Sequence, residues 1–317
     1  MGPVWWRLEM AAPAELEDSL LWKLPQLGVS RIALQHAPET PEHRQLLAWL
    51  PESDWPADQR QHLERALEPL GAPFGLAPGP IRWQRQADED WSLSWKRHWQ
   101  PDPVSERLLV LPAWLEVPAE HSARLVIRID PGSAFGTGSH PTTRLCLEAL
   151  EALAAERDRA AEGPALQGLR VADLGCGSGI LGLAALRLGA ASVAAADTDS
   201  LAERATRENA ALNGFDAASP GRGLTVATGS AEVLAELLED RPADLLLCNI
   251  LAPVIEALIP SFPRLLTPTG VGLLSGLLVD QIPALERALA AAGWRVTQRV
   301  DQDRWALLRI RNAPDVA

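Results

Sequence analysis

A glycine-rich turn between a buried strand and a helix is the strongest constraint in this sequence. The stretch Val171-Ala-Asp-Leu-Gly-Cys-Gly-Ser-Gly-Ile180 carries three alternating glycines. Each lets the backbone bend tightly, or approach a ligand where a Cβ would collide. Asp197 follows the next apolar run, 22 residues after Gly175. A glycine turn with an acid about 20 residues later is typical of a βαβ unit that holds the ribose of a nucleotide-like ligand.

The spacing of these glycines limits the class of ligand that the turn can bind. The turn is G-x-G-x-G, whereas the dinucleotide fingerprint is G-x-G-x-x-G, so a nicotinamide-dependent oxidoreductase is disfavoured. S-adenosylmethionine fits better, because it has a ribose and an adenine but no phosphate to bind at a helix N-terminus. Two alternatives stay open. Asp197 could instead be a helix cap, and Asp199 competes with it for the ribose.

Length and composition indicate a two-domain protein of the cytoplasm. The chain has 317 residues, of which 47% are hydrophobic, enough for a sizeable core. No apolar run reaches the roughly 20 residues that span a membrane, and the N-terminus lacks the pattern of a signal peptide. The three cysteines are far apart in the sequence, which is typical of buried thiols in a reducing compartment.

The charge balance limits the partners and cofactors. With a net charge of −12, the chain offers no basic surface for direct nucleic-acid binding. An acidic surface would attract a basic partner, more weakly at high salt, or would only aid solubility. No pair of histidines, cysteines or carboxylates has metal-ligand spacing, so no metal is expected. We expect a monomer.

Residues 1–86 predict a small α+β domain with the element order βαββαβ, typical of a ferredoxin-like fold. The third strand is the least defined, because Glu42–Trp49 could also be helical. A helical connector over residues 87–105 follows, with tryptophans spaced by four on one face. They either pack against a domain or grip a partner. The six elements are expected at Trp5–Met10, Ala14–Leu27, Ser30–Gln35, Arg44–Leu50, Ala57–Leu70 and Ile81–Gln86.

Residues 106–317 predict a Rossmann-like α/β domain. Short apolar strands alternate with helices, which implies a mostly parallel sheet covered on both faces. Whether the last strands return antiparallel is left open. Strands are expected at Leu108–Leu111, Leu125–Ile129, Leu169–Leu174, Ser192–Ala196, Leu224–Thr228, Ala243–Cys248, Gly270–Leu274 and Trp305–Ile310, and helices at Pro141–Ala154, Leu181–Leu188 and Ala202–Asn213.

Two further segments lie where such a sheet binds ligands, at the carboxyl ends of its strands. Asn249-Ile-Leu-Ala252 follows the strand that ends at Cys248, although an asparagine there could also just stabilise a turn. The glycine- and proline-rich segment Asp130–Thr143 precedes the first helix. His140 in this segment is either a base or, as we favour, the partner in a structural hydrogen bond.

Together these motifs make the sequence resemble the ribosomal protein L11 methyltransferase family. The family's pattern is carried by D-P-G-S-A-F-G-T-G-S-H-P-T-T over 130–143, D-L-G-C-G-S-G-I-L over 173–181 and N-I-L-A over 249–252. The resemblance implies a class I methyltransferase domain that uses S-adenosylmethionine. It also implies that the N-terminal domain recognises L11, whose amino groups are methylated. One departure is that Pro253-Val254 follows directly, where many members have one residue and then Pro-Leu.

The resemblance also implies roles for individual residues. Thr143 and Gly175 would line the pocket for the methionine part of the cofactor, and Gly177 in the same turn would also bind the cofactor. Asp197 would bind the ribose hydroxyls, and Asn249 would lie where methyl meets amine. A loop over the cofactor would be formed by Phe135, Gly136 and Thr137.

Other functions remain as alternatives. The chain could methylate another basic protein, or be a non-catalytic adaptor with a vestigial pocket. An intact glycine turn, with Asp197 and Asn249, argues against the adaptor. A glutamine-directed methyltransferase would carry N-P-P-Y, and this chain has N-I-L-A and no tyrosine.

Overall fold

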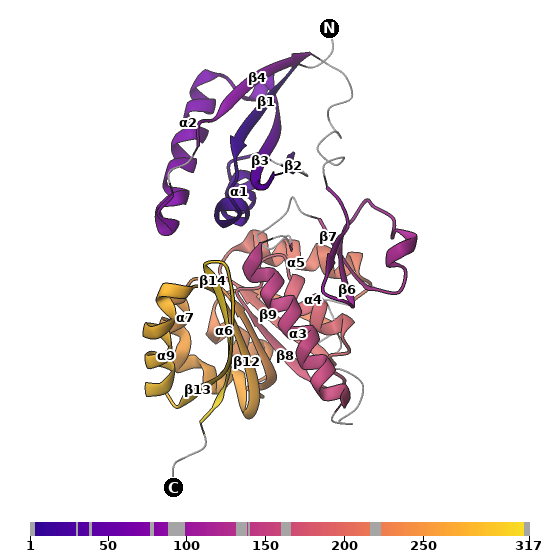
Figure 1. The fold of residues 1–317 in the computed structure, drawn as a ribbon, viewed down its shortest axis with the longest axis vertical. Helices are drawn as coiled ribbons and strands as arrows, with labels where there is room; N and C mark the ends of the chain where they lie inside the picture. Colours follow the sequence, from indigo (N-terminus) through magenta and orange to yellow (C-terminus); the bar gives the residue numbers. More distant parts are fainter. Residues whose placement is uncertain are drawn as a thin grey trace. The chain divides into compact units, whose positions relative to one another are not determined.

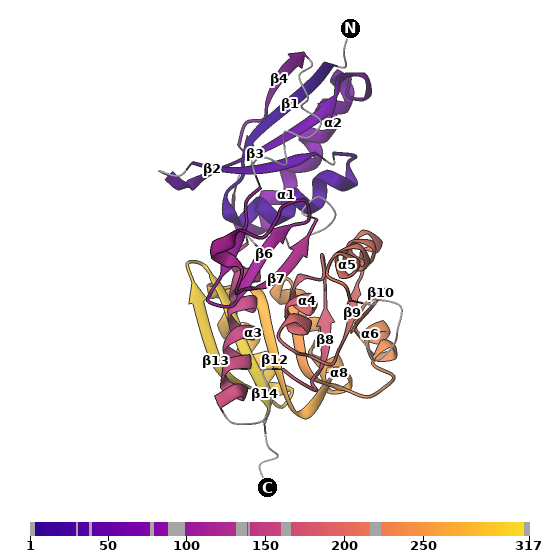
Figure 2. The ribbon, with the colours of Figure 1, turned by 90° about the vertical axis from the view of Figure 1, so that its right-hand side faces the viewer.

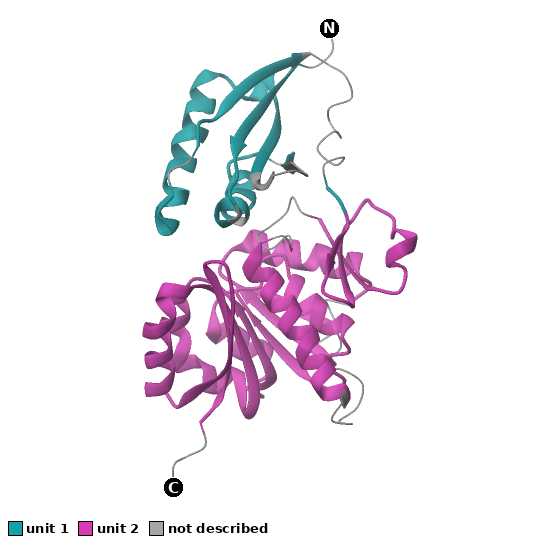
Figure 3. Cartoon of the chain, viewed as in Figure 1, with its two compact units in different colours: residues 1–100, 131–135 teal, residues 101–130, 136–317 magenta. Residues whose placement is uncertain are grey.

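The computed structural model of the chain describes residues 4–29, 31–37, 40–76, 79–87, 99–130, 138, 140–159, 166–215 and 223–313. The chain divides into two compact units, coloured in Figure 3. Unit 1 comprises residues 1–100 and 131–135, and unit 2 comprises residues 101–130 and 136–317. Most of the predicted connector, with Trp91 and Trp95, lies outside the described residues.

Unit 1 has the predicted βαββαβ order and a four-stranded antiparallel sheet in the order β2-β3-β1-β4. This is the ferredoxin-like arrangement (Figure 1). The uncertain third element is a strand, and it lies in the middle of the sheet, where backbone pairing on both sides stabilises it. The elements are β1 Val4–Ala11, α1 Ala14–Gln26, β2 Ile32–Ala37, β3 Thr40–Pro51, α2 Ala57–Leu67 and β4 Arg82–Ala87, with short 3-10 turns at Glu52–Asp54 and Glu68–Phe74.

The core of unit 1 forms where both helices cover one face of this sheet. Leucines spaced along α1 and α2 pack against alternating residues of β1 and β3, such as Leu8 and Leu46, which are fully buried. Trp99 also packs on this core, and its indole N–H donates to the carbonyl of Ile32 at 3.2 Å. Of the two roles predicted for the tryptophans of the connector, the structure therefore shows packing against a domain for Trp99.

Unit 2 is built on a seven-stranded sheet in the order β10-β9-β8-β11-β12-β14-β13. Neighbouring strands are parallel from β10 to β12, whereas β14 is antiparallel to both of its neighbours. The strands are β8 Arg170–Leu174, β9 Ser192–Asp197, β10 Gly223–Thr228, β11 Ala243–Asn249, β12 Leu266–Leu278, β13 Trp294–Gln302 and β14 Trp305–Asn312.

Helices cover both faces of this sheet, as predicted. Figures 1 and 2 show α3 and α4 on one side, and Figure 1 shows α7 and α9 on the other. The second side holds a core of fully buried apolar residues, in which Phe262 meets Trp294 edge to face at 5.9 Å. The helices are α3 Pro141–Arg159, α4 Ile180–Arg187, α5 Ser200–Leu212, α6 Ala231–Leu237, α7 Ala252–Leu258, α8 Phe262–Leu265 and α9 Ile282–Ala291.

The structure adds elements that the sequence pattern did not predict. The strands expected near residues 108 and 125 do form, but in a separate three-stranded sheet of β5 Asp102–Val104, β6 Leu108–Pro112 and β7 Leu125–Ile129. β13 was missed because it is an edge strand whose middle residues are mostly exposed, so its sequence lacks apolar alternation. Among the helices of the described residues, none is long and apolar enough to cross a bilayer.

Candidate functional site

The order of strands in the sheet reverses between β8 and β11. The glycine turn and the segment that begins with Asn249 both lie at this point. From β8 the chain proceeds outward through β9 and β10, whereas β11 begins the other half of the sheet. In open α/β sheets, ligands bind at the carboxyl ends of the strands on either side of such a reversal. The glycine turn follows β8 and Asn249 ends β11. The topology therefore places both motifs at the position where a ligand is expected.

The glycine turn needs glycine at all three positions. Gly175, Gly177 and Gly179 have φ angles of 76°, 55° and 79°, in the left-handed region that other residues rarely adopt. The amide of Gly179 donates to the carbonyl of Cys176 at 2.8 Å and closes the turn. The amide of Gly175 donates to the carbonyl of Ala196 at 2.8 Å, which fixes the turn against the end of β9.

The structure separates the two acids that compete in the sequence. The carboxylate of Asp199 accepts a hydrogen bond from the amide of Leu201 at 2.9 Å and caps α5. The carboxylate of Asp197 accepts the amide of Gly177 at 2.9 Å on Oδ2 and the amide of Asp199 at 3.0 Å on Oδ1. The structure thus shows Asp197 bonded to the glycine turn and Asp199 bonded to the start of α5. Burial raises the pKa of Asp197 above its usual value, and the bonds from these amides offset part of this rise.

Asn249 and Thr143, 106 residues apart, meet across the site. The Asn249 side-chain amide donates from Nδ2 to the hydroxyl oxygen of Thr143 at 3.3 Å. Oδ1 of Asn249 is buried and has no hydrogen-bond partner among the residues that the structure describes. A buried acceptor without a partner costs about 1–3 kcal/mol. This oxygen is therefore suited to accept a hydrogen bond from a bound molecule.

Ile250 joins the Asn249 segment to the glycine turn. A Cβ on Gly175 would collide with Cγ2 of Ile250, and a Cβ on Gly276 would collide with the backbone of Ile250. Gly276 lies at a bulge in β12, with a φ of 81°. Residue 250 thus fits between two glycines, so the position of Asn249 depends on both. Sequence reasoning overlooked Gly276, although an isolated glycine within an apolar strand signals a bulge or a close approach.

His140 has the structural role that we favoured. Its Nδ1 lies 2.8 Å from the hydroxyl of Thr142 and accepts the Thr142 amide at 3.3 Å, at the start of α3. Its ring packs edge to face on Trp305 at 4.9 Å, and it is 4% exposed. A histidine buried in these contacts fixes the beginning of the helix that carries Thr143.

Asp173 is a buried acid below the turn that sequence reasoning passed over. Its Oδ2 accepts the amide of Gly182 at 3.0 Å, whereas its Oδ1 is buried with no partner in the described part of the chain. Burial, helped by the nearby charge of Asp197, raises the pKa of Asp173 to about 7. The signal in the sequence was an acid inside an otherwise apolar strand.

The remaining predicted residues, Phe135, Gly136 and Thr137, lie outside the described residues. No group of three or more histidines, cysteines and acids suited to a metal is found in the described ranges. The expectation that no metal takes part stays a prediction.

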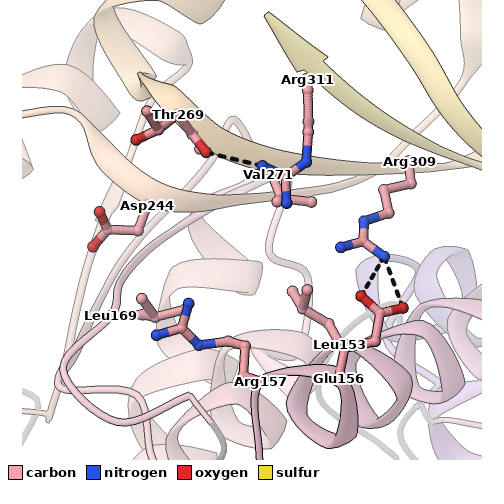
Figure 4. Close-up of a pocket in the computed structure, with 10 residues that line it drawn as sticks. Leu153, Glu156, Arg157, Leu169, Asp244, Thr269, Val271, Arg309 and Arg311 are labelled. Atoms are coloured by element: carbon pink, nitrogen blue, oxygen red, sulfur yellow. Dashed lines mark hydrogen bonds and ion pairs between the residues drawn. The ribbon is translucent and has the colours of Figure 1, made fainter. Parts of the chain in front are cut away.

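A cavity of about 430 Å³ lies elsewhere in unit 2, near the amino ends of β8 and β11 (Figure 4). None of the predicted site residues lines it. Arg309 points across it to Glu156, with two contacts at 2.8 and 3.0 Å, and Arg311 donates to the carbonyl of Thr269 at 3.3 Å. These bonds link α3 to β14 and β14 to β12, so the polar lining holds the sheet and helix together.

Comparison with known proteins identifies the family. The family model "Ribosomal protein L11 methyltransferase" matches residues 4–313. The chain belongs to this family. A ribosomal protein L11 methyltransferase of Synechococcus sp. (strain RCC307) is 62% identical over 311 residues, covering 98% of each chain. One of Parasynechococcus marenigrum (strain WH8102) is 63% identical over 302 residues, covering 95% of this chain and 99% of that one.

A solved structure agrees with this assignment. The ribosomal protein L11 methylase from Lactobacillus delbrueckii subsp. bulgaricus matches with a TM-score of 0.56 and 33% identity. The match covers 68% of this chain and 100% of that one. The predicted class I methyltransferase fold and family membership are therefore confirmed, and the chain is a methyltransferase.

We expect Gly276→Ala to destabilise unit 2 more than Gly293→Ala does. Both glycines have a φ of 81°, so a side chain costs each about 1–2 kcal/mol of backbone strain. Only at position 276 does the new Cβ also meet backbone atoms, whereas nothing lies within 4 Å at position 293. The extra cost should be about 1–3 kcal/mol. Urea denaturation of both variants measures it, and equal losses would contradict the close approach to Ile250.

We expect Asp173 to make stability fall as the pH rises from about 4 to about 7. Its pKa in the folded protein is about 7, and that of an unfolded aspartate is about 3.9. Between these values the folded state binds more protons than the unfolded state, so raising the pH favours unfolding. Relative to Asp173→Asn, the wild type should lose stability over this range and change little above it. Urea denaturation at a series of pH values measures this difference, and a constant difference would refute the raised pKa.

Proposed function

We propose that this methyltransferase transfers methyl groups from S-adenosylmethionine to amino groups of ribosomal protein L11. The names of its relatives support the substrate. The observation that carries the proposal is the meeting of Asn249 and Thr143 beside the glycine turn, where the order of strands reverses. The acceptors would be lysine side chains and the N-terminal amine.

The described residues fit S-adenosylmethionine. Each oxygen of Asp197 accepts a backbone amide, and because a carboxylate oxygen can accept more than one hydrogen bond, Asp197 can also accept from ribose hydroxyls. Gly175, Gly177 and Thr143 would line the methionine part. Phe135, Gly136 and Thr137 are proposed to cover the cofactor, as the resemblance implies.

Asn249 is proposed to orient the amine that accepts the methyl group. Thr143 holds the side-chain amide through Nδ2, and this leaves Oδ1 to accept an N–H from the incoming amine. When bound, S-adenosylmethionine supplies an already activated methyl group. The protein must therefore mainly align the nitrogen with that methyl. The amine must also be neutral, and because a lysine has a pKa near 10.4 in water, removal from water in the site would lower its pKa.

Unit 1 is proposed to recognise the substrate. We assign this role to residues 1–86, with residues 87–105 as the connector and 106–317 as the catalytic domain. The expectation that the whole connector is helical was wrong at its end, because residues 102–104 form strand β5 and pair with β6. The net charge of −12 would favour encounter with a basic protein. We propose that the protein acts as a monomer in the cytoplasm and contacts no nucleic acid directly.

The test is methyl transfer from labelled S-adenosylmethionine to purified L11, read by mass spectrometry. Mass increments of one methylene unit on lysines or on the N-terminus are expected. Cofactor binding without transfer to L11 would contradict the substrate and favour another basic protein. Absence of cofactor binding would contradict the enzyme assignment and favour the adaptor.

We expect Asn249→Ala to lower methyl transfer at saturating cofactor by about tenfold to a hundredfold, the size of losing a hydrogen bond to a reacting group. The Kd for S-adenosylmethionine should change by less than about threefold, because the ribose and methionine contacts come from other residues. Single-turnover kinetics and calorimetry measure the two quantities. Asn312→Ala, at an exposed strand end, is the matched control. If Asn249→Ala transfers methyl groups at the wild-type rate, Asn249 does not take part in the mechanism.

A further inference from the structure

Helix α5 carries a buried polar face against the glycine turn. Thr206 and Asn209 are fully buried, and Asn213 is 6% exposed. Spacings of three and four place these residues on one side of the helix, among the buried alanines 202, 205 and 210. Burial of polar side chains is costly unless each finds partners. Their partners therefore show what this face does.

Two of these side chains hold consecutive carbonyls of the turn. The hydroxyl of Thr206 donates to the carbonyl of Gly177 at 3.0 Å. Nδ2 of Asn209 donates to the carbonyl of Ser178 at 2.9 Å. The same turn is closed by its own bond, and the amide of Gly177 donates to Asp197. The orientation of the Asp197 carboxylate is therefore linked, through Gly177, to α5.

Asn209 also reaches the second segment of the site. Its Oδ1 accepts the amide of Asp130 at 2.9 Å. Asp130 ends the described stretch 99–130, immediately before the glycine-rich segment 131–137. One side chain thus uses its donor on the glycine turn and its acceptor on Asp130, the residue after β7, and so links the turn to the end of β7.

Asn213 makes similar bonds but does not hold the turn. Its Oδ1 accepts the amide of Arg128 at 2.9 Å, and its Nδ2 donates to the carbonyl of Arg128 at 2.7 Å. Nδ2 also donates to the carbonyl of Asn209 at 2.8 Å. This asparagine anchors β7 to α5, and within the described part of the chain none of its side-chain hydrogen bonds goes to residues 175–179.

We infer that Thr206 and Asn209 are positioning residues for the cofactor. They fix the turn carbonyls so that the Gly177 amide holds the Asp197 carboxylate, the group proposed to bind the ribose. This inference rests on the proposed function, because the ligand that it concerns is S-adenosylmethionine. Loss of either side chain should weaken cofactor binding without changing the methyl-transfer step. Their hydrogen bonds go to the glycine turn and to Asp130, and among the described residues none joins them to Asn249 or Thr143.

The experiment compares Thr206→Val, Thr206→Ser, Asn209→Leu and Asn213→Leu in the full chain. Calorimetry gives the Kd for S-adenosylmethionine, thermal unfolding gives Tm, and steady-state kinetics give KM and kcat. Thr206→Val and Asn209→Leu should each raise the Kd and the cofactor KM by roughly three- to tenfold, the effect of one hydrogen bond. Their kcat values should stay within about twofold.

Two controls separate positioning from general stability. Thr206→Ser keeps the hydroxyl and should bind the cofactor like the wild type. Asn213→Leu should lower Tm about as much as Asn209→Leu does and leave the Kd unchanged. If Thr206→Val binds as tightly as the wild type, or if the Kd follows Tm in all variants, the inference is overturned. If Asn209→Leu does not fold, the two Thr206 variants decide alone.

The proposed function fails by a different result. If the wild-type chain does not bind S-adenosylmethionine, the cofactor assignment is wrong. The positioning role of Thr206 and Asn209 is then wrong as well. A wild type that binds and methylates, with variants whose affinity is unchanged, overturns only the role of α5.

Discussion

The candidate site depends on how closely Ile250 approaches two glycines at the reversal of strand order. Ile250 lies where side chains on Gly175 and Gly276 would be, so the segments after β8, β11 and within β12 can meet only if both positions lack a Cβ. Because protein interiors have few voids, a small displacement of one closely packed residue also displaces its neighbours. Asn249 is adjacent to Ile250, and its position relative to the turn is thereby fixed by excluded volume before any hydrogen bond is considered.

Hydrogen bonds then orient the groups that this packing brings together. Three sets of contacts converge: Thr143 on the amide of Asn249, the Gly177 amide on Asp197, and α5 on the turn carbonyls. Two of these sets leave acceptor capacity unused, on Oδ1 of Asn249 and on the carboxylate of Asp197. A site built in this way is organised before the ligand arrives, so little ordering remains to be done on binding. This is suitable for a reaction in which alignment is the main task of the protein.

Much of this could be predicted from sequence because local chemistry determined it. Alternating glycines after an apolar strand admit few conformations, and Asp197 lies at the end of the next strand. The structure separates Asp197 from Asp199 by their partners, since the Asp197 carboxylate accepts an amide of the turn and the Asp199 carboxylate caps α5. The sequence could not make that distinction, because both acids lie within one turn of the helix start. The ribose role of Asp197 stays a proposal. Edge strand β13 was not predicted, because its exposed residues do not follow the apolar alternation that is typical of a strand.

The positioning residues were harder to predict, because their partners are remote in sequence. Thr206 and Asn209 lie 29 and 31 residues from the carbonyls that they hold, and nothing in the local pattern of α5 distinguishes them from surface polar residues. What distinguishes them is burial among alanines, which only the folded chain reveals. A helix face that combines small apolar residues with hydrogen-bonded Thr and Asn side chains can pack closely against a backbone segment and also form hydrogen bonds with it. The missing Cβ of Gly179 allows α5 to approach the turn, because a Cβ there would lie 2.8 Å from Cγ2 of Thr206. The hydrogen bonds of Thr206 and Asn209 then fix the orientation of the turn.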